Sequence, residues 1–204
     1  MNSKHKNNLT DQELIEQVLS GDIHAFGMII KKTERLVTQI VFKMVSDSEE
    51  RKDIAQDVYL KTFRGLSTFK FQSKLSTWIA KITYTTCLNY LEKQKSDSFS
   101  AVYVNDQADD EGEDHVADKL SSAPDNDIEA FIFQKQLSEI LKIEIEKLPP
   151  LYKTLITLYH NEELSYSEIA QVTELPEGTL KNYLFRARKT LKENLLQKYK
   201  REAL

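Results

Sequence analysis

The 204-residue sequence has little cysteine, glycine or proline, and each shortage narrows the fold. Cys87 is the only cysteine, so one chain cannot form a disulfide framework, a CxxC redox pair or a cysteine-based zinc site. This cysteine usage fits a reducing compartment. With five glycines and four prolines, few positions interrupt a pattern that is rich in leucine, isoleucine, lysine and glutamate. Such a composition favours helix.

Long apolar runs are also missing. No stretch approaches the roughly 20 apolar residues that a membrane-spanning helix needs. Residues 1–9 are polar and lack the apolar core of a secretory signal. We therefore expect a soluble, cytoplasmic protein without direct membrane insertion.

The sequence also lacks the usual motifs of enzymes. It has no glycine-rich phosphate loop and no nucleophile elbow. The four histidines are scattered, and none has metal-ligand spacing: His5, His24, His115 and His160. We therefore expect no cofactor, no bound metal, no small-molecule substrate and no enzymatic activity.

Charge is unevenly distributed along the chain. The net charge is −4, but eleven acidic residues against Lys119 alone lie between Ser96 and Glu129. From Gly178 to Arg201 there are eight basic residues, with Glu193 as the one acid. Because local charge governs binding to phosphates, the basic C-terminal end can bind nucleic acid despite the negative total.

Apolar periodicity divides the chain into three segments and predicts an all-α fold. Residues 10–95 and 128–204 have helical spacing of apolar residues, whereas residues 96–127 are acidic and have no apolar period. We expect two small helical domains joined by a flexible acidic linker.

Within the first segment, Ser46 with Glu49 forms a capping-box pattern that predicts a helix start. We expect that helix to direct Ile54, Val58 and Phe63 inward. A loop is expected at residues 67–76, before a helix in which Trp78 packs in the core.

The third segment has a short helix, a turn and a longer basic helix, which is the helix-turn-helix arrangement. Ser165 with Glu168 is a second capping-box pattern, and residues 174–178 form the turn. The longer helix has one apolar stripe: Leu180, Leu184, Ala187, Leu191 and Leu195. In this arrangement the first helix braces and the second enters the major groove.

The residues on the other faces of the longer helix suit DNA. Arginine can grip guanine with two hydrogen bonds, lysine and asparagine can reach bases or phosphates, and Phe185 could pack on a thymine methyl group. The alternative is that this basic amphipathic helix is a solvated face or binds a peptide.

The third segment resembles region 4 of the sigma-70 family, in its extracytoplasmic-function (ECF) group. The resemblance is carried by LPP at 148–150, LSYSEIA at 164–170, LPEGTLKN at 175–182 and RAR at 186–188. It implies that this segment reads the −35 promoter element. The implied −35 contacts are Ser165, Thr179, Lys181, Asn182, Phe185, Arg186, Arg188 and Lys189.

The run DIAQDVYLK at 53–61 resembles region 2.2 of the same family, which is its main polymerase-binding surface. An outer stripe of paired charges with Leu60 as its apolar anchor could meet a helical partner. The resemblance implies core-polymerase contacts from Asp53, Gln56, Asp57, Leu60, Lys61 and Arg64.

The run FKFQSKLSTWI at 69–79 resembles regions 2.3 and 2.4. The resemblance implies that this loop and helix open the −10 element and hold a flipped base of the non-template strand. Extruding a base costs stacking energy, which stacking and polar groups in a pocket must offset. The implied −10 contacts are Phe69, Lys70, Phe71, Gln72, Ser73, Lys74, Thr85 and Asn89. Because Thr85 stands where the family often has asparagine, we expect an altered −10 preference.

Together these resemblances predict an ECF sigma factor that binds core RNA polymerase and promoter DNA. They also imply control by an anti-sigma factor. Three alternatives remain at this point: a stand-alone helix-turn-helix regulator, an enzyme and a structural helical adaptor. The first would bind an operator tightly without polymerase, usually as a dimer, but the sequence has no dimerisation heptad.

Overall fold

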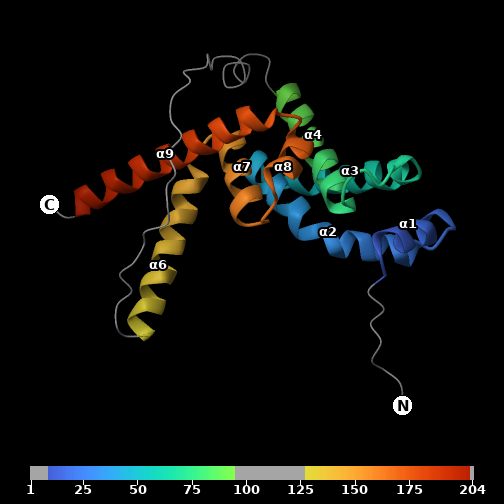
Figure 1. Cartoon of the computed structure of the whole chain (residues 1–204), viewed down its shortest axis with the longest axis horizontal. Coiled ribbons are helices and arrows are strands. Elements are labelled where there is room, and N and C mark those ends of the chain that lie inside the picture. Colours follow the sequence, from blue (N-terminus) through green and yellow to red (C-terminus); the bar gives the residue numbers. More distant parts are fainter. Residues whose placement is uncertain (1–8, 95–126, 203–204) are drawn as a thin grey trace.

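The computed structural model describes residues 9–94 and 127–202, without the side chains of residues 127–136 and 198–202 (Figure 1). The described residues form helices and no strand, which confirms the all-α prediction. The acidic linker predicted at 96–127 lies outside the described residues, apart from Asp127.

The N-terminal bundle is built around one long central helix. Its elements are α1 (Asp11–Leu19), α2 (Ile23–Met44), α3 (Ser48–Gly65), the 3₁₀ turn η1 (Leu66–Thr68) and α4 (Leu75–Gln94). Helix α2 packs against α1, α3 and α4, and its inward face carries Ile29, Val37 and Ile40, which are almost fully buried. Apolar residues at spacings of three and four place this stripe on the inner side of the helix.

The helix starts of the N-terminal bundle have side-chain caps. Thr10 and Glu13 form a reciprocal capping box at α1. The capping box predicted from Ser46 and Glu49 is wrong by one residue. Asp47 is the N-cap of α3, and its carboxylate accepts the Glu49 backbone N–H at 2.9 Å. The acidic side chain one residue later is an equally strong N-cap, so the helix begins at Ser48.

The C-terminal bundle matches the predicted order of helices. It contains α6 (Asp127–Glu146), α7 (Pro150–His160), α8 (Tyr166–Thr173) and α9 (Glu177–Glu202). Pro150 is the first residue of α7, where its missing N–H leaves no hydrogen bond unmade. The predicted Ser165–Glu168 capping box is confirmed, since each residue bonds the backbone N–H of the other.

The helix-turn-helix forms from α8 and α9. Helix α8 ends at Thr173 and is capped by Glu174, whose φ of 60° is left-handed and reverses the chain. Leu180, Leu184 and Ala187 are fully buried on the inner face of α9, as its apolar stripe predicted. Tyr183, which that stripe did not include, is also buried.

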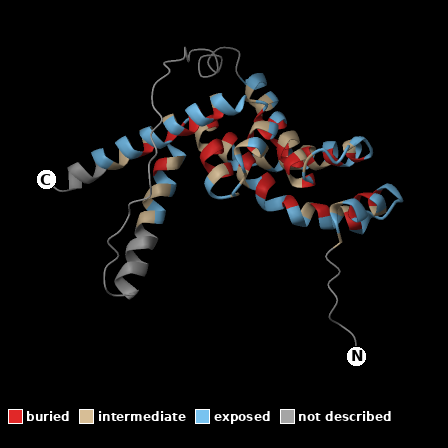
Figure 2. Ribbon diagram, viewed as in Figure 1, coloured by how far each residue is buried: buried red, intermediate tan, exposed pale blue. Residues whose placement is uncertain are grey.

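The two bundles pack against each other rather than standing apart. Helix α8 lies on α4 and α7 lies on α2. The buried side chains of both bundles, such as Ile79 and Ile169, belong to one continuous cluster (Figure 2). The sequence led us to expect separate small cores, because the period of each helix identifies an apolar face but not the distant face that covers it. Among the described helices, none combines the length and apolar character that a membrane span needs.

Candidate polymerase and nucleic-acid interfaces

The outer side of α3 carries the residues that the sequence assigned to polymerase. We name them the α3 stripe, and its members are Asp53, Gln56, Asp57, Leu60, Lys61 and Arg64. Asp57 is half-buried and the others are exposed; Leu60 leaves 54% of its surface open. The Lys61 ammonium lies 2.7 Å from the Asp57 carboxylate and donates to the Thr86 hydroxyl at 3.2 Å. These contacts hold the charged part of the stripe in place.

Phe63 does not point inward as predicted. It is 49% exposed, and its ring packs edge-on against Phe26 with 5.0 Å between the ring centroids. A residue at the border of the inner helical stripe can face either side, and α2 leaves Phe63 partly uncovered. The apolar area beside Leu60 is therefore larger than the sequence suggested.

A cleft of about 590 Å³ lies between α3 and α4. Its walls include Asp53, Asp57 and Lys61 from α3 and Asn89, Tyr90 and Lys93 from α4. The structure thus places Asn89, which the sequence grouped with the −10 contacts, beside the α3 stripe.

A second cleft, of about 470 Å³, lies where the loop after η1 meets α4, and we name it the α4 cleft. It brings together four of the predicted −10 residues: Phe69, Lys70, Gln72 and Ser73. Thr85 is exposed on α4 and does not line this cleft, and neither do Phe71 and Lys74. The remaining walls are Thr68, Thr77, Trp78, Lys81 and Gln171.

Three aromatic rings run from the core to the surface at the α4 cleft. The centroids of Trp78 and Phe69 are 5.1 Å apart, and those of Phe69 and Phe71 are 4.9 Å apart. Trp78 packs against the core, as expected, but is only partly buried and also lines the cleft. Phe71 is 52% exposed and has a φ of 55°, which is rare for a bulky residue and is typical of functional loops.

Thr77 gives the α4 cleft an unused polar group. The residue is 1% exposed, and within the described part of the chain its hydroxyl oxygen is the one buried side-chain polar atom without a hydrogen-bond partner. Sequence reasoning missed Thr77, Lys81 and Gln171. Thr77 and Lys81 are four residues apart on one face of α4, and Ser73 lies four residues before Thr77, just outside the helix. This spacing could have indicated Thr77 and Lys81.

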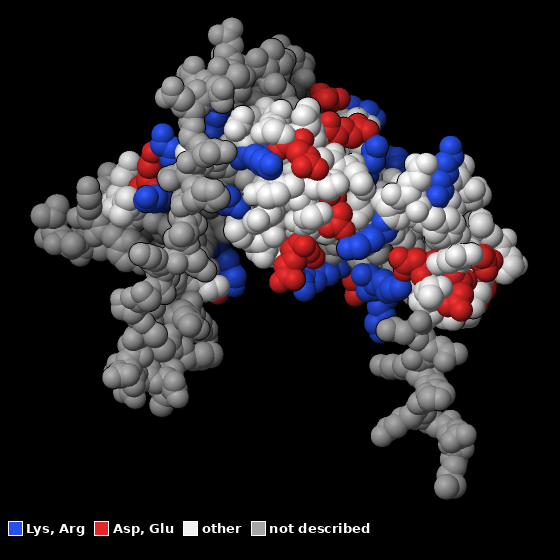
Figure 3. All heavy atoms as spheres, viewed as in Figure 1, with Lys and Arg blue, Asp and Glu red and all other residues white. Residues whose placement is uncertain are grey.

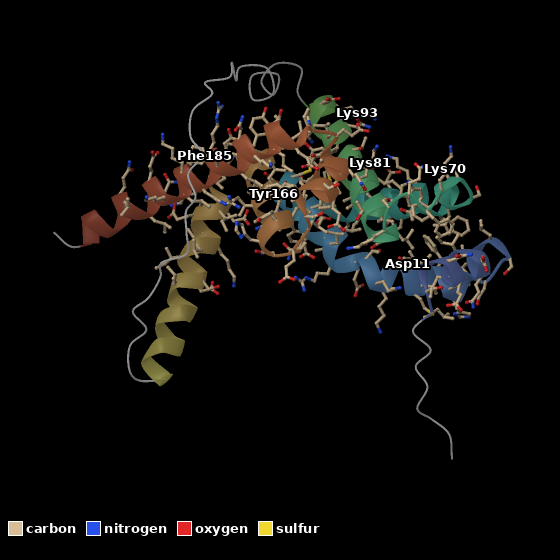
Figure 4. All side chains as sticks on the ribbon, viewed as in Figure 1. Asp11, Lys70, Lys81, Lys93, Tyr166 and Phe185 are labelled. Atoms are coloured by element: carbon tan, nitrogen blue, oxygen red, sulfur yellow. The ribbon has the colours of Figure 1, made fainter. Side chains whose placement is uncertain are left out.

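The outer face of α9 presents the predicted −35 residues, and we name it the α9 face. Lys181, Asn182, Phe185, Arg188 and Lys189 are exposed, and Figure 4 shows Phe185 on the outer side of the helix. Thr179 and Arg186 are half-buried. The hydroxyl of Ser165 is engaged in the capping box of α8. The DNA contacts of all these residues stay predictions.

Aromatic side chains orient two of these cations. The Lys181 ammonium lies 5.8 Å from the Tyr166 ring centroid, and the Arg188 guanidinium lies 5.1 Å from that of Tyr159. Arg188 also approaches the His160 ring nitrogen Nε2 at 3.4 Å. Partial burial and, to a smaller extent, the charge of Arg188 lower the pKa of His160, which favours the neutral ring.

On the face of the molecule seen in Figure 3, lysine and arginine are interspersed with aspartate and glutamate. This face therefore presents local groups of cations rather than a field of one sign.

Comparison with known families agrees with this arrangement. The family model for sigma-70 region 2 matches residues 29–96, and the model for sigma-70 region 4 matches residues 139–191. The first match covers α3 and α4 with both clefts except Gln171, and the second covers the helix-turn-helix. The chain therefore belongs to the sigma-70 family of transcription initiation factors.

Curated relatives narrow the group. The chain is 31% identical to the RNA polymerase sigma-H factor of Pseudomonas aeruginosa, over 95% of this chain and 97% of that protein. It is 32% identical to the ECF RNA polymerase sigma-E factor of Escherichia coli K12, over 90% of this chain and 93% of that protein. These matches confirm that it is a sigma factor of the ECF type, which directs RNA polymerase to promoter DNA.

Two solved structures share its fold. CnrH in complex with the cytosolic domain of CnrY has a TM-score of 0.58 at 17% identity, and covers 91% of this chain and 96% of its own. The sigma factor RpoE in complex with the anti-sigma factor NepR from Bartonella quintana has a TM-score of 0.58 at 19% identity, with coverage of 85% and 98%. At this identity the likeness shows the fold alone.

Proposed function

We propose that this ECF sigma factor divides its work among three surfaces. The α3 stripe docks on core RNA polymerase, the α4 cleft holds melted −10 DNA and the α9 face reads the −35 element. The first two belong to a domain at residues 10–95 and the third to a domain at residues 128–204. The protein acts in the cytoplasm and catalyses no reaction itself.

The α4 cleft is the observation that carries this proposal. Its aromatic wall offers stacking to an unpaired base, and alanine substitution of such a stacking residue typically costs about 1–3 kcal/mol of binding. Lys70 and Lys81 lie at the rim, where phosphates of the same strand would pass. Thr77 also lines the cleft with a buried hydroxyl that has no protein partner, and this hydroxyl can bond a polar edge of the base once the base displaces the side chains that cover it. Stacking, charge and an unused polar group together suit a flipped nucleotide.

The α9 face supports major-groove reading by a different chemistry. Lys181, Asn182, Lys189 and Arg188 offer donors for phosphates and base edges, and Phe185 offers an apolar contact for thymine. Each surface alone would bind DNA weakly. Mounting both on one polymerase makes the second contact intramolecular, so modest affinities suffice.

An anti-sigma partner forms part of the proposal. One structural relative is a sigma factor in complex with the anti-sigma factor NepR, and this chain shares its fold. The exposed side chains of Leu60 and Phe63 give a protein partner an apolar contact on α3. An anti-sigma factor that covered this area would compete with core polymerase.

The test is run-off transcription with core polymerase on genomic promoters. Asp57→Ala should weaken binding to polymerase while the DNA contacts survive, and Arg186→Ala should lose −35-dependent initiation. Glu34→Ala, an exposed acid on α2 outside the three surfaces, is the matched control.

A stand-alone helix-turn-helix regulator, the alternative that the sequence left open, would give a different result. It predicts tight operator binding by the free chain and no effect of Asp57→Ala on transcription. A chain that fails to associate with core polymerase would contradict the proposed function directly.

A further inference from the structure

The ion pairs between the two bundles all have the same polarity. Among the described residues, each cation comes from the N-terminal bundle and each carboxylate from the C-terminal bundle. The pairs are Lys74–Glu168 at 2.8 Å, Lys81–Glu174 at 2.6 Å, Arg35–Glu162 at 3.2 Å and Lys43–Glu146. The N-terminal bundle therefore meets the C-terminal bundle with positive charge that it could otherwise offer to DNA.

Two of these pairs flank the α4 cleft. Lys74 and Lys81 are seven residues apart on or just before α4, about 10 Å along a helix axis. Glu168 lies in the first turn of α8, and Glu174 is the residue that follows its last turn. Gln171 lies between these glutamates and forms part of the cleft wall. Helix α8 thus runs across the cleft, and Figure 4 shows Lys81 of α4 where the two helices meet.

Carboxylate and phosphate oxygens compete for the same lysine donors. Both make charge-assisted hydrogen bonds with an ammonium group. While Lys74 and Lys81 hold Glu168 and Glu174, those glutamates occupy the donor positions that a strand across the cleft would use. Gln171 occupies part of the space in front of the cleft as well.

We propose that α8 is an internal substitute for the promoter strand on α4, with Glu168 and Glu174 in place of two phosphates. Strand binding then requires α8 to leave the α4 cleft, and Lys81 is a phosphate contact in the open form. This inference rests on the proposed role of the α4 cleft in holding −10 DNA.

We call the arrangement in which α8 lies on the α4 cleft the closed form, and its contacts are suited to opening. The Lys74 side chain is 72% exposed, and Glu174 is 67% exposed, so each pair contributes little and salt screens it. The packing of α8 on α4, within one continuous apolar cluster, supplies the remaining stabilisation. Polymerase that binds both bundles in a separated arrangement would shift the population toward the open form by its preference for that form.

The test removes both α8 carboxylates without breaking the fold. In the double variant Glu168→Gln with Glu174→Gln, glutamine at 168 still completes the capping box with Ser165. The control is Glu139→Gln with Glu163→Gln, which changes net charge equally. Glu139 pairs within α6, and Glu163 has a φ of 52° and so matches the left-handed backbone of Glu174. Thermal unfolding checks that both variants are folded.

Binding of the free chain to a fluorescent single-stranded −10 oligonucleotide is measured by anisotropy at fixed salt. We expect the α8 double variant to bind at least about fivefold more tightly than the control, the lower end of usual coupling between sites. Adding Lys81→Gln should remove most of that gain. Hydrogen exchange at α4 and α8 should be faster in the α8 double variant than in the control.

Equal affinity and equal exchange in the two double variants would overturn this inference. Transcription by the wild-type holoenzyme separates that result from failure of the proposed function. If the holoenzyme melts −10 DNA while the double variants behave alike, only the internal substitute is wrong. If the wild-type holoenzyme does not melt it, the role of the α4 cleft is wrong.

Discussion

The Trp78 indole packs against the backbone of Gly65, so closely that a Cβ at Gly65 would lie 3.3 Å from two indole carbons. Gly65 ends α3, and Trp78 belongs to the first turns of α4. The contact joins the helix that bears the α3 stripe to the wall of the α4 cleft. A glycine at this position lets the indole lie flat where a larger residue would displace it.

Gly65→Ala should displace Trp78 and reduce −10 melting. Alanine is the better helix former by up to about 1 kcal/mol, so the crowding and the propensity gain oppose each other and stability should change little. Because Trp78 is the only tryptophan, its emission spectrum should shift. Permanganate reactivity of promoter thymines with the holoenzyme measures melting.

The control for this substitution is Gly27→Ala in α2, where an added Cβ meets nothing within 4 Å. It should stabilise the protein by up to about 1 kcal/mol and leave the tryptophan emission unchanged. If Gly65→Ala leaves both the emission and the melting unchanged, the contact does not position the cleft wall.

Thr77→Val should separate stability from DNA recognition. Valine has nearly the shape of threonine and removes a buried hydroxyl that has no protein partner. The melting temperature should stay equal or rise, by about 2–4 °C for each kcal/mol gained. If the hydroxyl bonds the flipped base, discrimination between −10 sequences should fall at the same time. Unfolding scans and transcription from a set of −10 variants measure the two effects, and a lower melting temperature would contradict the assignment.

Local signals in the sequence predicted much of this structure. The capping box of Ser165 and Glu168 and the apolar stripe through Leu184 fixed α8 and α9 correctly, because both depend on residues within two turns. The same reasoning missed Asp47 as the cap of α3, since neighbouring polar residues compete for that position.

Contacts between distant segments were not predictable in this way. Helical periodicity assigned Phe63 to the core, but the exposed fraction of its side chain depends on how much of it α2 covers. Gln171 reaches the α4 cleft only because α8 packs on α4. No short-range pattern specifies which of two apolar faces will meet, so the wall that α8 adds to the cleft required the three-dimensional structure.

Cys87 should be unreactive in the folded protein. It is fully buried in α4, and burial raises the pKa of its thiol to about 12, although the charge of Lys61 acts in the opposite direction. The reactive thiolate is therefore scarce at pH 8. Alkylation by iodoacetamide should be at least about 100-fold slower in buffer than in denaturant, where the pKa returns to about 8.5. Comparable rates, followed by mass spectrometry, would show that α4 opens readily.

Arg188, which the proposal places among the DNA contacts of the α9 face, should also influence the titration of His160. Partial burial is the larger cause of the lowered His160 pKa, and the guanidinium charge adds to it. Arg188→Gln should therefore raise this pKa toward its ordinary value without reaching it. Titration of the ring proton by NMR measures the change, and Lys192→Gln, an exposed cation one turn further along α9, serves as the control. An unchanged pKa in Arg188→Gln would show that the 3.4 Å approach between the two side chains does not persist in solution.

The lowered pKa of His160 also determines how pH changes the stability of the folded protein. A group whose pKa is lower in the folded state makes the folded protein relatively less stable as it becomes protonated. The contribution of His160 is thus complete above its ordinary pKa of about 6.5 and is lost as the pH falls through the folded value. His160→Gln should flatten the fall in unfolding free energy below about pH 6.5, because glutamine does not titrate there. Denaturant melts across this range test it, and a variant whose pH dependence matches the wild type would exclude His160 as the cause.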